Sequence, residues 1–306
     1  MTMQFGVSIW PFHWQAPYDE GIRRIAALGY RQTELIAWNR ETLDDYYTPA
    51  GIAGLLRTLQ DCDVAVSEFV TTPRGIASPD AARRTAGIDQ FKRAVEVAVA
   101  LGAPMMNSVV ATPFDLPFPG MLELPITQEV KVTLPPGLNW QQGYDDYVES
   151  LRLCCAACEG AGLRYALETH PYRWATTAMS LARLIEHVGS PALGINLDPS
   201  HLFPCGELPQ VAVYQLGSRV FHCHFSDNDG QSNAHWRPGK GKVDWRATLI
   251  ALRDVGFDGV ISLELEGAPG SASGRNPIAG PQLDIEYNES RAYLTRLAQE
   301  EGITLT

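Results

Sequence analysis

Short apolar segments alternate with longer amphipathic segments along the whole chain. The apolar segments are rich in Val, Ile, Leu, Phe and Tyr, residues that favour β-strands. The longer segments repeat apolar residues with helical spacing, and several end at a glycine. Strands are predicted at residues 4–10, 31–36, 64–70, 104–110, 163–168, 192–197, 219–225 and 259–265. Helices are predicted at residues 18–28, 48–61, 79–101, 141–159, 178–188, 208–216, 245–255 and 285–300.

This alternation predicts an α/β fold, specifically a (β/α)8 TIM barrel that residues 1–306 form as a single domain. Parallel strands need crossover helices, and eight strand–helix repeats close such a barrel. A doubly wound open sheet is the alternative, but it requires a glycine-rich phosphate-binding turn after the first strand. The sequence there, at residues 10–14, is Trp-Pro-Phe-His-Trp and contains no glycine.

One segment interrupts the repeat. Residues 111–140, after the fourth predicted strand, are rich in Pro and Gly and show no clear strand or helix pattern. Loops of this length are uncommon in compact domains and usually have a function. We therefore predict that this insertion is a lid or a contact between subunits.

Four of the predicted strands end in a residue that can bind a metal ion. A carboxylate is rarely buried in a strand unless another group compensates its charge. Active-site residues of TIM barrels lie at the C-terminal ends of the strands. Three carboxylates and one imidazole form a mostly oxygen site, which favours Mn²⁺, with Mg²⁺, Co²⁺ or Zn²⁺ as alternatives. The four predicted ligands are Glu168, Asp198, His224 and Glu264.

Charge narrows the classes of partner. The chain has 35 Asp and Glu against 24 Lys and Arg, a formal net charge of −11. Nucleic-acid binding depends on clustered Lys and Arg, so we expect a small or neutral substrate instead. No uninterrupted apolar segment is close to the length of about 20 residues that a membrane-spanning helix needs. The N-terminus lacks the pattern of a signal peptide, so we expect a cytoplasmic location.

Three cysteines, Cys154, Cys155 and Cys158, are spaced closely enough to suggest a zinc site. They lie within a predicted helix, and the chain has no second Cys or His pair at zinc-finger spacing. We interpret them as buried free thiols.

Side-chain alternation along the strands orders the residues around the predicted ligands. It places His222 one layer below His224 on the inward face of the barrel. We interpret His222 as a hydrogen-bonding residue behind the metal site, with a ligand role as the alternative. Glu264 and Glu266 also share one face, and Glu264 is preferred as the ligand because it follows its strand directly.

Loops that follow the strands supply candidates for substrate binding. His201 lies three residues after Asp198 and can turn back over the barrel mouth. The alternative is a helix N-cap formed by Asp198 or Ser200, with no function for His201. Arg173 is a candidate for binding substrate, with a solvated loop residue as the alternative. His13 is another candidate, with core packing under its loop as the alternative. The remaining candidates are His170, Arg173, His235, Trp10, His13, Asn107 and Lys240.

At these residues the chain resembles the xylose-isomerase-like TIM-barrel superfamily, in its sugar phosphate isomerase/epimerase branch. The resemblance implies one divalent ion held by the four predicted ligands and an acid/base pair formed by Glu168 and Glu264. It also implies that His201 binds substrate, that the substrate is carbohydrate-like, and that the chain forms a homo-oligomer, a dimer or a tetramer. The matching motifs are Leu-Glu168-Thr-His-Pro, Asn-Leu-Asp198-Pro-Ser-His201, His222-Cys-His224-Phe-Ser-Asp, Pro-Gly-Lys-Gly-Lys-Val-Asp244-Trp and Ile-Ser-Leu-Glu264.

The function implied by the resemblance is that of a sugar, keto-sugar or inosose isomerase or epimerase working through a metal-stabilised enediolate. A lyase is the alternative, because loss of a leaving group from the same enolate gives an inosose or dehydroshikimate dehydratase, or cleaves an oxidised glycoside. A non-catalytic partner subunit and a DNA-repair endonuclease are further alternatives. The endonucleases have Asp where this chain has Asn233. Ketose epimerases have Asn and a second Glu soon after the equivalent of Glu168, where Thr-His-Pro follows here.

Overall fold

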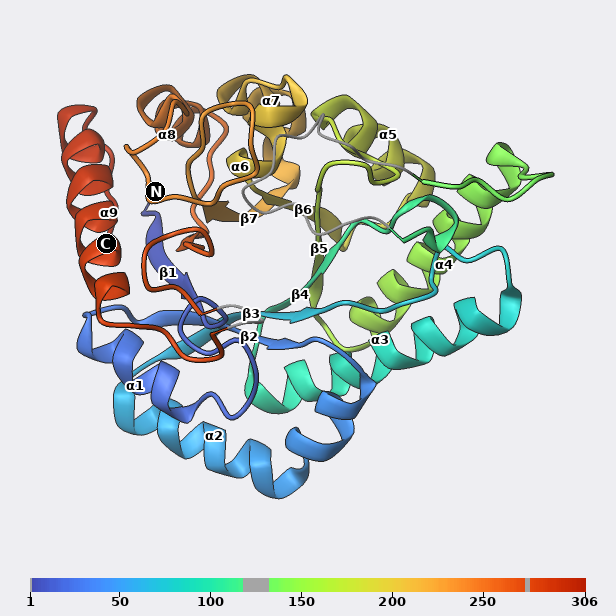
Figure 1. Cartoon of the computed structure of the whole chain (residues 1–306), viewed down its shortest axis with the longest axis horizontal. Helices are drawn as coiled ribbons and strands as arrows, with labels where there is room; N and C mark the ends of the chain where they lie inside the picture. The colour runs from blue at the N-terminus through green and yellow to red at the C-terminus, as the bar shows by residue number, and fades with distance from the viewer. Residues whose placement is uncertain (1, 118–131, 273–275) are drawn as a thin grey trace.

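Eight parallel strands form a closed barrel in the computed structural model, which describes residues 2–117, 132–272 and 276–306. Each strand pairs with the next one along the chain, and the eighth closes the ring by pairing with the first, Val260 opposite Gln4. Helices surround the barrel (Figure 1), so the structure confirms the predicted (β/α)8 fold. The strands are β1 Gln4–Ser8, β2 Gln32–Ala37, β3 Ala65–Thr71, β4 Met105–Val109, β5 Arg164–Glu168, β6 Leu193–Leu197, β7 Val220–Phe225 and β8 Val260–Leu263.

The long helices occupy the predicted positions. Several one-turn helices were not predicted, because so few residues do not form a periodic pattern. The long helices are α1 Asp19–Ala27, α2 Pro49–Cys62, α3 Ala81–Leu101, α4 Trp140–Gly160, α5 Ala178–Val188, α7 Pro209–Leu216, α8 Trp245–Asp254 and α9 Gln282–Glu300. The short ones are a π-helix Thr42–Tyr46, α6 Pro199–Leu202, and the 3₁₀ turns Pro113–Asp115, Phe203–Cys205 and Gly217–Arg219.

Local sequence explains where the long helices begin and end. The hydroxyl of Thr177 accepts a hydrogen bond from the N–H of Ser180, and the Ser180 hydroxyl accepts one from the N–H of Thr177. This capping box starts α5, which ends at Gly189 with a left-handed φ of 76°. Asp80 caps α3 at its start, and Gly102, with a φ of 74°, ends it.

The first strand is shorter than predicted. The pattern predicts a strand through Trp10, whereas β1 ends at Ser8. The carbonyl of Ile9 accepts hydrogen bonds from the N–H groups of Phe12 and His13, so the chain turns there instead of continuing the ladder. Beside this turn, Trp10 contacts His224 and Trp14 stacks on Trp38.

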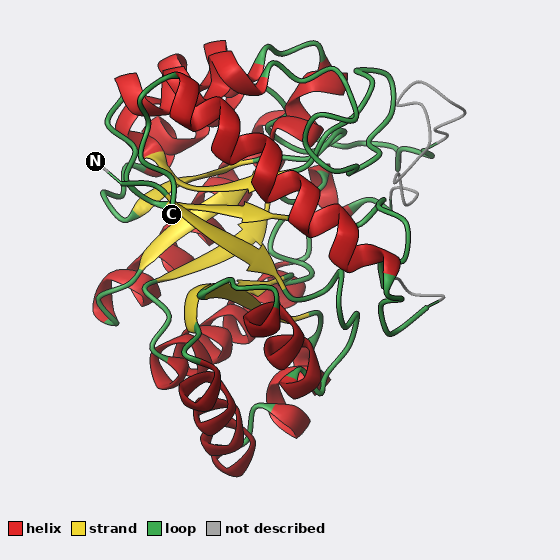
Figure 2. Cartoon of the chain, turned by 90° about the vertical axis from the view of Figure 1, so that its left-hand side faces the viewer, coloured by secondary structure: helices red, strands yellow, loops and turns green. Residues whose placement is uncertain are grey.

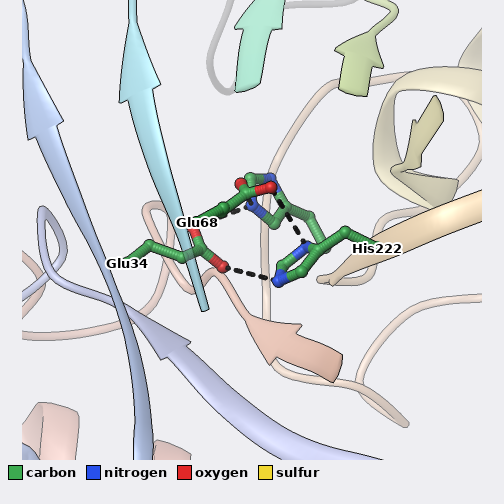
Figure 3. Close-up of side chains that lie close together, drawn as sticks. Glu34, Glu68 and His222 are labelled. Carbon is green, nitrogen blue, oxygen red and sulfur yellow. Dashed lines mark hydrogen bonds and ion pairs between the residues drawn. The ribbon is translucent and has the colours of Figure 1, made fainter. Parts of the chain in front are cut away.

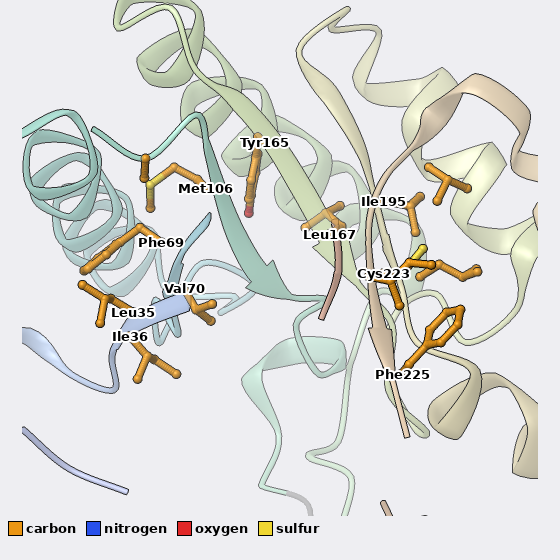
Figure 4. Packing of buried hydrophobic residues seen from close by; sticks show 14 of the residues in the cluster. Leu35, Ile36, Phe69, Val70, Met106, Tyr165, Leu167, Ile195, Cys223 and Phe225 are labelled. Carbon is orange, nitrogen blue, oxygen red and sulfur yellow. The ribbon is translucent and has the colours of Figure 1, made fainter. Parts of the chain in front are cut away.

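The hydrophobic core lies between the outer face of the barrel and the helices. Phe225 of β7 packs against Trp245 of α8, with ring centroids 4.5 Å apart. Tyr165 of β5 packs against Phe91 of α3 at 4.8 Å. Removal of these side chains from water drives the packing of helices on strands. Figure 4 shows buried side chains of this core from neighbouring strands, among them Leu35, Phe69, Met106, Tyr165, Leu167, Ile195, Cys223 and Phe225.

The two ends of the chain meet beside β1. The N–H of Phe5 donates to the carbonyl of Thr306 at 2.7 Å, and the N–H of Thr306 donates to the carbonyl of Met3 at 3.1 Å. Figure 2 shows the two termini close together, with the strands enclosed by helices. The last residues therefore extend the pairing of the first strand.

The three clustered cysteines are buried and free, as predicted. Cys154, Cys155 and Cys158 lie on α4, and burial raises the pKa of each thiol. None of the helices within the described residues has the length and apolarity needed to cross a membrane.

The structure describes both ends of the predicted insertion at residues 111–140. Phe114 packs against Trp140 and Trp174, with ring centroids 5.8 and 5.3 Å apart. Asn139 caps α4 by accepting a hydrogen bond from the N–H of Gln142. Residues 118–131 lie outside the described residues, so a lid or subunit contact stays a prediction.

Candidate active site

The four predicted ligands come together at the C-terminal mouth of the barrel. Glu168 ends β5, Asp198 follows β6, His224 lies in β7 and Glu264 follows β8. One potential ligand atom from each lies within 4.8 Å of those from the others. A single ion with bonds of about 2.0–2.6 Å can reach four atoms at this spacing. All four residues are buried, and we call them the carboxylate–histidine cluster.

The cluster has more hydrogen-bond acceptors than donors. His224 Nδ1 lies 2.8 Å from Glu168 Oε1 and 3.4 Å from Glu264 Oε2. Asp198 Oδ2 and Glu264 Oε2 are buried without a hydrogen-bond partner among the described residues. Unpaired buried carboxylate oxygens are costly unless a cation compensates them. The residues present therefore fit a divalent ion that prefers oxygen ligands.

Asp198 is held by the backbone of the short helix that follows it. Its Oδ1 accepts a hydrogen bond from the N–H of Ser200 at 2.6 Å, and Pro199 is the first residue of α6. The N-cap considered as an alternative in the sequence is thus present. The cap uses Oδ1 and leaves Oδ2 without a hydrogen bond among the described residues, so it is compatible with a ligand role.

Burial and neighbouring charges set the protonation of the cluster. Burial raises the pKa of Glu168 to about 7, although His224 lowers it. Burial also raises the pKa of Asp198 well above its ordinary value. For Glu264, burial is outweighed by His224 and His235, so its pKa lies well below the ordinary value. Titratable groups whose pKa values are pushed apart are typical of acid/base pairs.

Two stacked imidazoles lie beside the cluster. His201 Nε2 is 3.3 Å from Asp198 Oδ2, and its Nδ1 is 2.8 Å from Asn233 Oδ1. His170 stacks on His201 with ring centroids 3.5 Å apart, and its Nε2 is 3.8 Å from Glu168 Oε2. Burial holds the pKa of both rings well below the ordinary value. They are therefore neutral near pH 7 and able to bind hydroxyl groups.

A third imidazole, His235, reaches the cluster from the loop after β7. Its Nδ1 lies 2.9 Å from Ser226 Oγ and 3.4 Å from Glu264 Oε2. Its φ of 22° is uncommon for a residue other than glycine and is the kind of strain found at functional sites. Burial disfavours the charged ring, but the close contact with Glu264 and the charge of Asp198 raise the pKa of His235 to about 10.

A cleft of about 1010 Å³ opens at the same end of the barrel. Trp14 and Trp38 line it and stack with ring centroids 4.9 Å apart. The ring of Trp38 also packs against that of Trp10, with ring centroids 6.3 Å apart. Trp10 Nε1 donates a hydrogen bond to Glu264 Oε1 at 2.9 Å. An aromatic wall thus connects the cleft with the cluster. Arg173 also lines the cleft, and its buried Nε has no partner among the described residues.

Residues 22–297 match the family of xylose isomerase-like TIM barrels. The chain belongs to this family. The D-psicose 3-epimerase of Agrobacterium fabrum is 23% identical over 268 residues, 86% of this chain and 84% of the relative. The fructoselysine 3-epimerase of Shigella flexneri is 23% identical over 260 residues, 83% of this chain and 87% of the relative. Both relatives are named as epimerases of sugars or sugar conjugates.

A solved structure shows the same fold. The structure of D-psicose 3-epimerase with D-tagatose from Clostridium cellulolyticum H10 has a TM-score of 0.77 and 19% identity, and the match covers 96% of this chain and 99% of that one. Another relative, the 3-dehydroshikimate dehydratase of Bacillus anthracis, is 32% identical over 95 residues, 31% of this chain and 34% of the relative. The xylose isomerase-like relatives thus include enzymes named for epimerisation and one named for dehydration.

Three residues that the sequence predicts to bind substrate make no hydrogen bond or ion pair with the cluster among the described residues. His13 is buried, and its backbone pairs with the loop before α9, which agrees with the core-packing alternative. Asn107 donates to Glu68 Oε1 at 2.8 Å inside the barrel and so lies below the mouth. Lys240 is exposed in a turn, and no hydrogen bond or ion pair among the described residues joins it to the cluster.

The sequence analysis missed two buried glutamates below the cluster. Glu34 of β2 and Glu68 of β3 are fully buried, and both contact His224. Each could have been recognised in the sequence as a carboxylate followed by two apolar residues within a predicted strand. Asn233 was considered only as a difference from the endonucleases, whereas it holds the ring of His201.

Proposed function

We propose that this chain is a divalent-metal-dependent epimerase or isomerase of a keto sugar or an inosose. The observation that carries the proposal is the convergence of three carboxylates and His224 at the mouth of the barrel, with two buried oxygens unpaired. The epimerases of psicose and fructoselysine among the relatives support the same class of substrate. Mn²⁺ is the expected ion, with Mg²⁺, Co²⁺ or Zn²⁺ as alternatives.

The carboxylate–histidine cluster would hold the ion, which when bound polarises a substrate carbonyl and the neighbouring hydroxyl. One glutamate of the pair, Glu168 and Glu264, removes the proton from the carbon next to the carbonyl. The other glutamate returns a proton to the opposite face for epimerisation. Return of the proton to the neighbouring carbon instead gives isomerisation. Glu264 Oε2 makes no hydrogen bond within the described part of the chain and has only the 3.4 Å contacts to the rings of His224 and His235, so it is available for this task.

The surrounding residues fit a carbohydrate. The neutral rings of His170 and His201 can hydrogen-bond substrate hydroxyl groups, because each has one N–H and one acceptor nitrogen. Trp10 presents an aromatic side chain for the apolar face of a sugar ring, while its Nε1 fixes Glu264. Arg173 can bind a hydroxyl or an acidic group at the edge of the site.

The cleft, which none of the four cluster residues lines, offers space for a second unit attached to the sugar at the cluster. Its volume of about 1010 Å³ lies at the upper end of the range of about 300–1,000 Å³ for small-molecule sites. The stacked Trp14 and Trp38 offer an aromatic surface there. We therefore include keto sugars that carry a second unit among the substrates to be tested.

A lyase is the second candidate function. It shares the first step, proton removal next to a carbonyl, and differs only in losing a leaving group from the neighbouring carbon. The dehydratase among the relatives favours keeping this alternative. The product, therefore, separates the two functions.

The test is conversion of a substrate panel by metal-free protein with and without added Mn²⁺. Keto sugars, inososes and oxidised glycosides are incubated, and products are identified by NMR and mass. We expect a product of unchanged mass only when Mn²⁺ is present. A product that has lost water or an aglycone would establish a lyase, and no conversion of any substrate would support a non-catalytic partner subunit. Light scattering tests the prediction that the chain forms a dimer or a tetramer. The cytoplasmic location also stays a prediction.

A further inference from the structure

A layer of polar residues fills the barrel directly below the carboxylate–histidine cluster. Its members are fully buried and come from separate strands of the barrel. Figure 3 shows Glu34, Glu68 and His222 of this layer pointing toward one another inside the barrel. His222 Nε2 lies 3.6 Å from Glu34 Oε1, and its Nδ1 lies 3.7 Å from Glu68 Oε2. The layer is completed by Asn107, which donates to Glu68, and by Asn196, next to His222.

This composition is unusual for the inside of a TIM barrel. Barrel interiors are filled mainly by branched apolar side chains. Two carboxylates at this depth cost free energy unless they are hydrogen-bonded. Ser8 donates to Glu34 Oε2 at 3.0 Å and Asn107 to Glu68 Oε1 at 2.8 Å, yet Glu34 Oε1 and Glu68 Oε2 have no hydrogen-bond partner within the described parts of the chain. A structural role alone does not account for carboxylates here, because apolar residues would fill the space without this cost.

The layer contacts the cluster through one ring. His224 Nε2 lies 2.9 Å from Glu34 Oε2 and 3.3 Å from Glu68 Oε1. The other nitrogen of the same ring, Nδ1, faces Glu168 and Glu264. The imidazole of His224 therefore joins the lower layer to the upper cluster, with one nitrogen on each side.

The position of the proton on this ring decides whether it can bind a cation. A neutral imidazole carries one proton, and only the nitrogen without it can be a ligand. A carboxylate at Nε2 accepts a hydrogen bond and keeps the proton there. Glu168 Oε1 lies 2.8 Å from Nδ1 and competes for the proton while no cation is bound. When a cation occupies the cluster, Glu168 is one of its ligands, and the carboxylates at Nε2 then leave the lone pair of Nδ1 directed at the cation. Carboxylates that act on ligand histidines in this way raise their affinity for metal ions.

We propose that Glu34 is a positioning residue for the metal site, which holds the proton of His224 on Nε2 so that Nδ1 is free to bind the ion. This inference rests on the proposed function, because it assigns His224 a ligand role. Glu34 makes the shorter of the two contacts to Nε2. Ser8 donates a hydrogen bond to one oxygen of its carboxylate, and His222 lies 3.6 Å from the other. Glu68 supports the arrangement from the longer distance of 3.3 Å.

The first test measures ion affinity in the full-length protein. Mn²⁺ binding is titrated by calorimetry for wild type, Glu34→Gln and Glu68→Gln, and bound metal is counted by mass spectrometry. We expect one ion per chain in wild type, and an affinity about 10–100-fold weaker in Glu34→Gln, the usual effect of losing such a partner. Glu68→Gln should weaken binding less.

Asp227→Asn is the matched control. Asp227 is also a fully buried carboxylate close to the end of β7, but it accepts hydrogen bonds from loop N–H groups and from Trp245 Nε1 instead of contacting the cluster. Its substitution should lower thermal stability and leave Mn²⁺ affinity unchanged. If Asp227→Asn weakens binding as much as Glu34→Gln, the effect of Glu34 is general destabilisation and the proposal fails.

The second test reads the proton position directly. The protein contains 7 histidines, so protein labelled with ¹⁵N-histidine and loaded with diamagnetic Zn²⁺ gives a tractable NMR spectrum, in which a His224→Gln variant assigns the ring. We expect His224 to carry its proton on Nε2 in wild type. In Glu34→Gln we expect the proton to be divided between Nε2 and Nδ1. A proton on Nδ1 in wild type, or an unchanged spectrum and affinity in Glu34→Gln, would overturn the proposal.

Three further outcomes are distinct. Glu34, Glu68, His222 and His224 themselves have potential ligand atoms within 4.8 Å of one another. Two ions per chain in wild type, with one lost in Glu34→Gln, would make the layer a second ion site and overturn the positioning role. No ion bound by wild type would overturn the proposed function together with this inference. If wild type binds one ion and epimerises its substrate, and Glu34→Gln has the same Mn²⁺ affinity as wild type, this inference alone would be overturned.

Discussion

His224 Nδ1 lies 2.8 Å from Glu168 Oε1, although the two residues are 56 positions apart and belong to strands that do not pair with each other. In TIM barrels, inward side chains of alternate strands meet at one level. Glu168 on β5 and His224 on β7 follow this rule. The contact shows that closure of the barrel, and not local sequence, assembles the candidate metal site.

Asp198→Asn should weaken Mn²⁺ binding at least about tenfold, because it replaces a charged ligand by a neutral one while keeping the Oδ1 that caps α6. Calorimetric titration measures the change. Asp244→Asn is the control, since Asp244 caps α8 through the N–H of Ala247 in the same way without joining the cluster. Equal affinities for the two variants would remove Asp198 from the ligand set.

Glu168→Gln and Glu264→Gln should each reduce turnover by about 10²-fold or more, the usual contribution of an acid/base group. Much of the substrate binding should survive, because the amide has nearly the same shape as the carboxyl group. Turnover and substrate affinity are measured separately on metal-loaded protein. Near-normal turnover in either variant shows that the substituted residue is not an acid/base group.

His201→Ala should retain the ion and lose about 10²-fold in turnover, the scale of one lost electrostatic donor. The reason is the position of His201 beside Asp198 and in stacking contact with His170. Metal analysis and kinetics together separate the alternatives. Loss of the ion would make His201 a ligand, and unchanged kinetics with lower thermal stability would make it a structural residue.

The cysteines on α4 should react slowly with a thiol reagent in the native protein. Burial raises the pKa of Cys155 to about 11, so at pH 8 roughly a thousandth of this thiol is the reactive thiolate. Burial also raises the pKa of Cys154 and Cys158. Reaction with Ellman's reagent, followed before and after unfolding, tests this. All 6 thiols should react once the chain is unfolded, and equally fast reaction in the native state would contradict burial on α4.

The sequence predicted the strands, the long helices and the four residues of the cluster for one physical reason. Each predicted ligand lies at or just beyond the C-terminal end of an apolar strand, and parallel strands bring these ends to one edge. Side-chain alternation also predicts that His222 lies one layer below His224, and the structure has it there.

Other features of the site depend on closure of the barrel and could not be read from the pattern. Glu34 and Glu68 lie in early strands, and only the closed ring brings them to a histidine of β7. Lys240 seemed suited to the site because its loop follows β7, but the turn leaves its side chain in solvent. The direction of a loop side chain depends on tertiary contacts that a linear pattern does not contain.

Exchange of the substrate proton with solvent tests the central claim most directly. Metal-loaded protein is incubated in D₂O with the keto sugar that it converts, and deuterium is located by NMR. We predict deuterium at the carbon next to the carbonyl, dependent on Mn²⁺ and lost in Glu168→Gln. Conversion without deuterium at that carbon, or exchange that proceeds equally well in metal-free protein, would contradict a metal-dependent reaction through an enediolate.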